Sequence, residues 1–137
     1  MLRGTDVNRK IRVVVTKMGL DAHDRGVRFI AKSLQNAGMD VIYLGLFNTP
    51  EAVANVAVQE SADVIAVSSL SQEHRTHVPA LMKALEKADA KEIHVIVGGL
   101  VLGEDEKYLR KWGIKGIYGP AASINEVIKD IREMVRV

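Results

Sequence analysis

The chain has 137 residues, of which 47% are hydrophobic and 26% charged, and its formal net charge at neutral pH is +2. This length is enough for one domain with a hydrophobic core and too short for two ordinary ones. The small net charge and the few aromatic residues argue against a nucleic-acid-binding surface. The absence of cysteine excludes disulfides, thiolate nucleophiles and Cys-ligated metal centres, so a metal would rely on His and carboxylates or arrive inside a cofactor.

The sequence offers no sign of a membrane or secretion signal. No apolar run approaches the roughly 20 residues needed to span a bilayer, and the first six residues lack a signal-peptide core. We therefore expect a cytoplasmic protein that does not associate with membranes. Residues 1–9 are expected to form an N-terminal tail, and residues 10–137 a single domain.

Short β-branched runs alternate with helical patterns along the chain, which is typical of a parallel sheet built from βα units. The third and fourth runs are apolar throughout, which indicates burial on both faces. The five expected strands are residues 11–16, 41–44, 64–68, 93–97 and 116–118.

The expected helices have recognisable ends. Gly38 is well placed to end the first helix, Thr49-Pro50 has the pattern of an N-cap followed by the first helical position, and Ser123 with Glu126 has the capping-box spacing. The fourth helix is expected over about residues 104–111. The outward positions of the last helix, among them Lys129 and Asp130, are expected to form a solvated face. The apolar positions expected to face the sheet are Val27, Ile30, Ala31 and Leu34, then Val53, Val56 and Ala57, then Val78, Leu81, Met82 and Leu85, and finally Val127, Ile128, Ile131 and Val135.

Five strands in this alternation predict an α/β fold of the flavodoxin-like, Rossmann-like class, with a doubly wound parallel sheet in the order 2-1-3-4-5. Ligands of such sheets bind at the carboxyl edge, near the switch point between strands 1 and 3. The loops expected to meet there are residues 17–26, 68–74, 98–99 and 118–122.

The first of these loops holds a carboxylate and an imidazole one residue apart, at Asp21 and His23. A carboxylate that binds one ring nitrogen of a histidine fixes its tautomer and raises the basicity of the other nitrogen, as a metal ligand requires. Taken alone, such a pair is more often a local turn hydrogen bond. His23 is therefore a candidate metal ligand that needs support from the other loops.

Three common occupants of this edge fit poorly. A phosphorylated receiver domain would need an aspartate where strand 3 ends in Ser68. A flavin-phosphate loop would be opposed by the charges of Asp21 and Asp24. A dinucleotide site needs glycines that lie closer together than Gly19 and Gly26.

Three motifs in order, Asp21-Ala22-His23-Asp24-Arg25-Gly26, Ser68-Ser69-Leu70 and Gly98-Gly99, resemble the cobalamin-binding domain of adenosylcobalamin-dependent mutases. The resemblance covers the chain from Lys10 onward. The flanking segments Lys17-Met18-Gly19 and Leu46-Phe47-Asn48-Thr49-Pro50-Glu51 look most like methylmalonyl-CoA mutase. Glutamate mutase's small subunit shares the core motif but matches these flanks less well.

The resemblance implies that His23 replaces the cofactor's own dimethylbenzimidazole as the lower axial ligand of cobalt in adenosylcobalamin. Asp21 would hydrogen-bond the other imidazole nitrogen and Lys17 would engage Asp21, so both would tune His23; Asp24, Arg25 and Gly26 complete the motif. The alternative interpretation is that Lys17 is only a charged residue on the surface, with no role in tuning His23.

The displaced nucleotide tail would enter a slot beside the sheet. There Ser68 would bond the benzimidazole, Leu70 would pack on it, and Gly98 and Gly99 would allow close backbone approach. Tyr118 and Gly119 would close the slot's end. The family commonly has Gly-Pro-Gly-Thr after the fifth strand, whereas this chain has Gly119-Pro120-Ala121-Ala122, so a hydroxyl contact near the tail is missing there.

A single domain of this kind has no chamber that could enclose a coenzyme-A thioester and protect a radical from water. The resemblance therefore implies a separate, large TIM-barrel subunit and an isomerase active only with it. The expected reaction interconverts (R)-methylmalonyl-CoA and succinyl-CoA, with the cofactor supplying the radical chemistry. Another acyl-CoA mutase, acting on isobutyryl-CoA or 2-hydroxyisobutyryl-CoA, a corrinoid methyl carrier and a non-enzymatic cobalamin sensor remain as alternatives.

Overall fold

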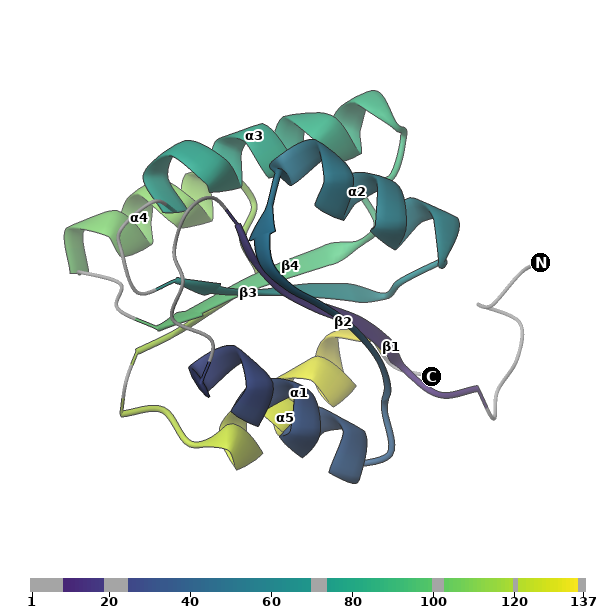
Figure 1. Cartoon of the computed structure of the whole chain (residues 1–137). Coiled ribbons are helices and arrows are strands. Elements are labelled where there is room, and N and C mark those ends of the chain that lie inside the picture. The colour runs from purple at the N-terminus through teal and green to yellow at the C-terminus, as the bar shows by residue number, and fades with distance from the viewer. Residues whose placement is uncertain (1–8, 19–24, 70–73, 100–102, 120, 136–137) are drawn as a thin grey trace.

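The structure, a computed structural model, describes residues 9–18, 25–69, 74–99, 103–119 and 121–135. Its centre is a five-stranded parallel sheet in the order β2-β1-β3-β4-β5, as the sequence predicts (Figure 1). The strands are β1 (Arg12–Met18), β2 (Asp40–Asn48), β3 (Val64–Ser69), β4 (His94–Gly99) and β5 (Gly116–Tyr118).

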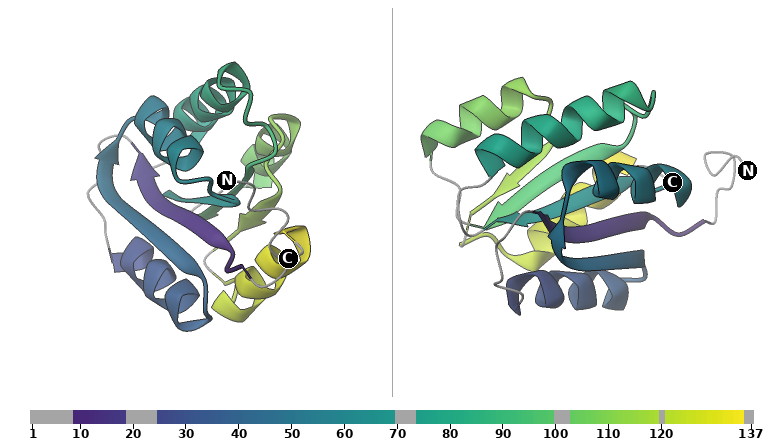
Figure 2. Two further views of the ribbon diagram at one scale, coloured as in Figure 1. Left: turned by 90° about the vertical axis from the view of Figure 1, so that its right-hand side faces the viewer. Right: turned by 45° about the horizontal axis from the view of Figure 1, so that its top comes forward.

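Five helices cover the two faces of the sheet. The helices α2, α3 and α4 lie on one face, and α1 and α5 lie on the other (Figures 1 and 2). Their bounds are α1 (Arg25–Asn36), α2 (Pro50–Gln59), α3 (His74–Lys87), α4 (Gly103–Lys111) and α5 (Ile124–Val135). Within the described residues, no helix combines the length and the apolar character needed to cross a bilayer.

Alternate residues of the central strands feed two separate cores. Val14 and Ile65 belong to the core under α2, α3 and α4, whereas Val15 and Ala66 belong to the core under α1 and α5. All six residues of β3 are buried, which confirms the prediction that this strand is covered on both faces.

The expected helix signals at two N-termini are confirmed. Thr49 Oγ1 accepts a hydrogen bond from the Ala52 backbone N–H (3.1 Å) in front of Pro50, the first residue of α2. Ser123 Oγ accepts from the Glu126 backbone N–H (3.2 Å) at the start of α5.

The first loop of the carboxyl edge is shorter than predicted. Lys17 and Met18 belong to β1, and Arg25 and Gly26 belong to α1. β1 can continue because β2 also runs further than the predicted 41–44, and Met18 pairs with Asn48. Two register shifts in this ladder accommodate the extra length. Strand β4 begins one residue later than predicted, at His94, and ends two residues later, at Gly99.

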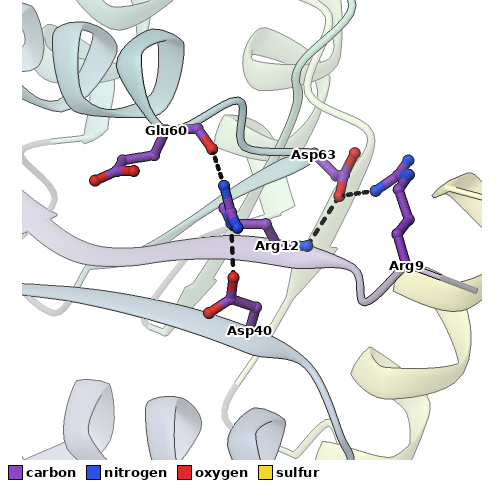
Figure 3. Close-up of polar contacts among 5 residues, drawn as sticks. All are labelled: Arg9, Arg12, Asp40, Glu60 and Asp63. Carbon is purple, nitrogen blue, oxygen red and sulfur yellow. Dashed lines mark hydrogen bonds and ion pairs between the residues drawn. The ribbon is translucent and has the colours of Figure 1, made fainter. Parts of the chain in front are cut away.

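A polar network ties together the opposite, amino edge of the sheet (Figure 3). Asp63 Oδ2 accepts from Arg9 Nη1 (2.7 Å) and from the Arg12 backbone N–H (2.8 Å). The Arg12 guanidinium in turn donates to Asp40 Oδ2 (2.7 Å) and to the Glu60 carbonyl (2.5 Å). Arg9, at the end of the expected tail, is thus anchored to the domain. This network braces the edge that lies opposite the loops of interest.

Candidate cofactor-binding site

The carboxyl ends of β1, β3, β4 and β5 lie along one edge of the sheet, on the left in Figure 1. Of the predicted site residues, the structure describes those at the strand ends and at the start of α1. These are Lys17, Arg25, Gly26, Ser68, Gly98, Gly99, Tyr118 and Gly119. Asp21, His23, Asp24 and Leu70 lie outside the described residues.

Strand register places three of the predicted slot residues in one row across the sheet. Ser68 pairs with Gly98, and Gly98 pairs with Tyr118. Because neighbouring strands lie only about 5 Å apart, residues from β3, β4 and β5 meet here although they are distant in sequence.

A cavity of about 40 Å³ opens above this row, between the sheet and the helices α1 and α5. Its lining is apolar apart from the Ser68 and Tyr118 side chains and consists of Val15, Ile30, Ala66, Val67, Ser68, Ile96, Gly98, Tyr118 and Val127. A space of this size holds a few water molecules, so a bicyclic base would enter only if α1 or α5 moved outward. Three residues of the predicted slot, Ser68, Gly98 and Tyr118, line this cavity.

The fold places different demands on the two adjacent glycines. Gly99 has a φ of +115°, and a Cβ built on it would lie 2.1 Å from the Ser69 carbonyl oxygen, so the fold itself demands glycine there. A Cβ on Gly98 would make only ordinary contacts, 3.7 Å to the Tyr118 carbonyl oxygen and 3.9 Å to Tyr118 Cβ. The fold alone therefore does not require a glycine at position 98.

Lys17 is completely buried, with an exposed fraction of 0%. Its Nζ donates to the Ser68 carbonyl oxygen at 3.4 Å, which joins the ends of β1 and β3 across the switch point. A buried ammonium is costly unless hydrogen-bonded and paired with an anion. The surface-charge interpretation of Lys17 is therefore wrong.

Asn48 was not singled out from the sequence as a site residue, although it belongs to the resembling flank. Its Nδ2 lies 3.1 Å from both Thr16 Oγ1 and the Gly45 carbonyl oxygen, and 3.4 Å from the Lys17 carbonyl oxygen. This side chain holds the end of β1 against the irregular end of β2. It thereby fixes the starting point of the segment that carries Asp21 and His23.

The prediction that the outward residues of α5 form a solvated face is wrong at Asp130. Tyr118 is 8% exposed, and its Oη donates to Asp130 Oδ2 at 2.8 Å. Burial first, and then the hydrogen bond to this carboxylate and its charge, raise the pKa of Tyr118 well above its usual value. Tyr118 is thus a neutral donor at ordinary pH. The contact joins β5 to α5, which no local sequence signal could reveal.

A second unpredicted group joins the starts of α3 and α4, beside the same edge. Asp105 is 1% exposed and pairs with the Arg75 guanidinium, which lies 5.4 Å from the centre of the Tyr108 ring. Pro79 has no N–H to offer the Arg75 carbonyl one turn earlier, and Tyr108 Oη donates to that carbonyl instead (3.3 Å). The two helices that follow β3 and β4 are therefore held in a defined mutual position.

The remaining predicted residues are exposed. Arg25 and Gly26 open α1, and Gly119 follows β5. Among the described residues, no atom lies within 4 Å of a Cβ built on Gly26 or on Gly119. Together with the cavity, this edge could receive an extended ligand that lies over the strand ends and sends one arm between the sheet and α1 and α5.

Comparison with known proteins decides which ligand this is. The model of the B12 binding domain family matches residues 11–129. The chain belongs to the B12-binding domain family. Its cofactor is cobalamin.

Relatives of this B12-binding domain are found both as separate small subunits and as parts of longer chains. The 2-hydroxyisobutanoyl-CoA mutase small subunit of Aquincola tertiaricarbonis is 44% identical over 91% of this chain and 92% of its own. The pivalyl-CoA mutase small subunit of Xanthobacter autotrophicus is 41% identical over 88% of this chain and 81% of its own. The methylmalonyl-CoA mutase of Escherichia coli is 35% identical over 95% of this chain, which spans only 18% of that protein.

Solved structures agree on the fold at low sequence identity. A cobalamin-binding protein from Desulfitobacterium hafniense superposes with a TM-score of 0.80 at 16% identity, over 93% of this chain and 60% of that one. The signal receiver domain of NarL from Mycobacterium tuberculosis superposes with a TM-score of 0.70 at 15% identity, over 93% of this chain and 97% of that one. Cobalamin proteins and receiver domains share this fold, so the fold alone does not choose the ligand.

The described residues of the B12-binding domain fit cobalamin. The cavity is apolar, as a benzimidazole requires, and Ser68 supplies one hydroxyl at its wall. Gly98 leaves open a space that any side chain would fill. A mostly apolar lining with few polar groups is typical of cofactor sites, and the cavity must widen before a base can enter it.

Proposed function

We propose that this B12-binding domain is the small, cobalamin-binding subunit of an adenosylcobalamin-dependent acyl-CoA mutase, an isomerase. The observation that carries the proposal is the match to two mutase small subunits along most of both chains. The mostly apolar cavity lined by Ser68 and Gly98 supports it, because the nucleotide tail could enter there if the cavity widened.

Within this proposal one ring nitrogen of His23 would bind the cobalt of the cofactor, and Asp21 would accept a hydrogen bond from the other ring nitrogen. The buried ammonium of Lys17, at the end of β1, supports the pairing with Asp21, since a buried cation is stabilised by a nearby carboxylate. An ionised Asp21 would keep the imidazole oriented and raise its basicity. Asp24, Arg25 and Gly26 would lie along the same loop and helix start.

The nucleotide tail would occupy the cavity between the sheet and the helices α1 and α5. Ser68 would hydrogen-bond the base, Leu70 would pack on it, and Gly98 would allow it to approach β4. Gly99 would give the end of β4 the backbone conformation that allows this approach. Tyr118 and Gly119 would form the closed end of the slot. The Ala121-Ala122 pair offers no hydroxyl to the tail. The nearby hydroxyl of Ser123 caps α5, where Oγ accepts from the Glu126 backbone N–H.

When bound, adenosylcobalamin supplies radical chemistry through homolysis of its cobalt–carbon bond. This chain's residues would hold the cofactor, orient it and exclude water from its lower face. The acyl-CoA would be bound by a separate large TIM-barrel subunit. The two small-subunit relatives support this division, because a small subunit implies a larger partner.

The proposed substrate is (R)-methylmalonyl-CoA, interconverted with succinyl-CoA, since the flanking motifs look most like those of methylmalonyl-CoA mutase. 2-Hydroxyisobutyryl-CoA is the second candidate. It is favoured by the 44% identity to the corresponding small subunit, which extends over 92% of that subunit. A cytoplasmic location stays a prediction from the sequence.

The test is reconstitution with the large subunit that co-purifies with this chain. Adenosylcobalamin and each acyl-CoA are added, and the isomeric products are quantified by mass spectrometry. Product formed only when both subunits are present, and from one acyl-CoA in preference to the others, is the expected result. Turnover by this chain alone would contradict the two-subunit proposal, and preference for 2-hydroxyisobutyryl-CoA would replace the first substrate by the second.

A further inference from the structure

The Tyr118 side chain is fixed at two points beyond its own backbone. A Cβ built on Gly116 would lie 2.6 Å from Tyr118 Oη, 2.9 Å from Cε2 and 3.0 Å from Cζ, so the ring folds back along β5 over Gly116. At the far end of the ring, Oη donates to Asp130 Oδ2 of α5 at 2.8 Å. Only a glycine at position 116 allows this ring position.

This ring position matters because Tyr118 forms one wall of the cavity. Its backbone pairs with Gly98, the residue that keeps the floor of the cavity open. In another rotamer the Tyr118 ring would no longer pack over Gly116, and its position beside the cavity above Gly98 would change. The size of the cavity on this side therefore depends on what holds the ring.

We propose that Asp130 is a positioning residue for the binding of the nucleotide tail of cobalamin. Its carboxylate holds Tyr118 against Gly116, so that the ring forms a fixed end wall of the slot. The inference rests on the proposed tail slot. Since the cavity of about 40 Å³ must widen to admit the base, a wall fixed on the β5 side directs the widening to the α1 side.

The partial burial of Asp130 supports this role over a purely solvated one. Its carboxylate accepts from a neutral phenol held within the α5 interface, and a hydrogen bond to a charged acceptor is stronger than one between neutral groups. Its neighbour Lys129 is exposed and provides a matched control on the same helix.

The experiment compares two probes that share the corrin ring. Adenosylcobalamin carries the nucleotide tail, and adenosylcobinamide lacks it. Dissociation constants are measured by absorbance titration of the full chain and of Asp130→Ala, Tyr118→Phe, the double variant and Lys129→Ala. Chemical denaturation of each variant checks that it is folded.

We expect Asp130→Ala and Tyr118→Phe each to bind adenosylcobalamin about 3- to 10-fold more weakly. The double variant should be no weaker than the weaker single variant, because both changes remove one interaction. Affinity for adenosylcobinamide should stay within about 2-fold in every variant, and Lys129→Ala should match the wild type for both probes.

Equal losses for both probes would show that Asp130 only stabilises the domain, and an unchanged affinity for adenosylcobalamin would show no role at all; either result overturns the inference. If Asp130→Ala does not fold, Tyr118→Phe carries the test, since it keeps the ring and loses only the hydroxyl. A wild-type chain that binds both probes equally would instead refute the tail slot itself.

Discussion

Gly98 and Gly99 are neighbours in β4, and the structure predicts that replacing them by alanine has opposite consequences. At Gly99 an alanine must adopt a φ of +115° and place its Cβ 2.1 Å from the Ser69 carbonyl oxygen. The backbone conformation alone costs an L-residue about 1–3 kcal/mol, and relief of the overlap adds to it. We expect Gly99→Ala to lower the free energy of unfolding by about 2–4 kcal/mol.

At Gly98 the backbone is ordinary and the nearest atoms of Tyr118 lie 3.7 and 3.9 Å from the built Cβ. The free energy of unfolding should change by less than about 1 kcal/mol. The added methyl group nevertheless enters the cavity of about 40 Å³. Overpacking costs typically about 1–3 kcal/mol, so cobalamin should bind about 5- to 150-fold more weakly.

The two variants are compared by urea denaturation without cofactor and by titration with adenosylcobalamin. The denaturation midpoint should fall by about 1–2 M for Gly99→Ala and hardly at all for Gly98→Ala. The reasoning would be refuted if Gly98→Ala lost as much stability as Gly99→Ala, or if folded Gly98→Ala bound cobalamin as tightly as the wild type.

Two further predictions concern the cobalt ligand and alkaline stability. His23→Ala should abolish the base-off, histidine-on absorption spectrum of bound adenosylcobalamin, and an unchanged spectrum would contradict the assignment of His23 as the cobalt ligand. Asp21→Asn should weaken adenosylcobalamin binding about 10- to 100-fold, and an equal affinity would show that Asp21 is only a turn residue. The raised pKa of Tyr118 means that above about pH 10 the unfolded chain loses a proton that the folded chain keeps, so the free energy of unfolding should fall as pH rises through this range. Denaturation at about pH 9 and about pH 11 should show a smaller decline for Tyr118→Phe than for the wild type, and an identical decline would contradict the assignment.

The sequence by itself determined the fold class, because period and capping are local properties. The β-branched runs and the caps at Thr49 and Ser123 predicted the alternation of strands and helices, and this alternation limits the sheet to few topologies. The ordered motifs led to the cobalamin family, which the comparison confirmed. The strand ends were less accurate, since the length of β1 depends on the partner strand β2 and its register shifts.

Only the tertiary structure decided how the residues around the slot act. The burial of Lys17 follows from its position between β1 and β3, and the difference between Gly98 and Gly99 follows from a backbone angle and one neighbouring carbonyl. Asp130 looks like any outward residue of an amphipathic helix until β5 places the Tyr118 hydroxyl beside it. These properties depend on contacts between strands and helices far apart in sequence, so no local pattern of residues could encode them.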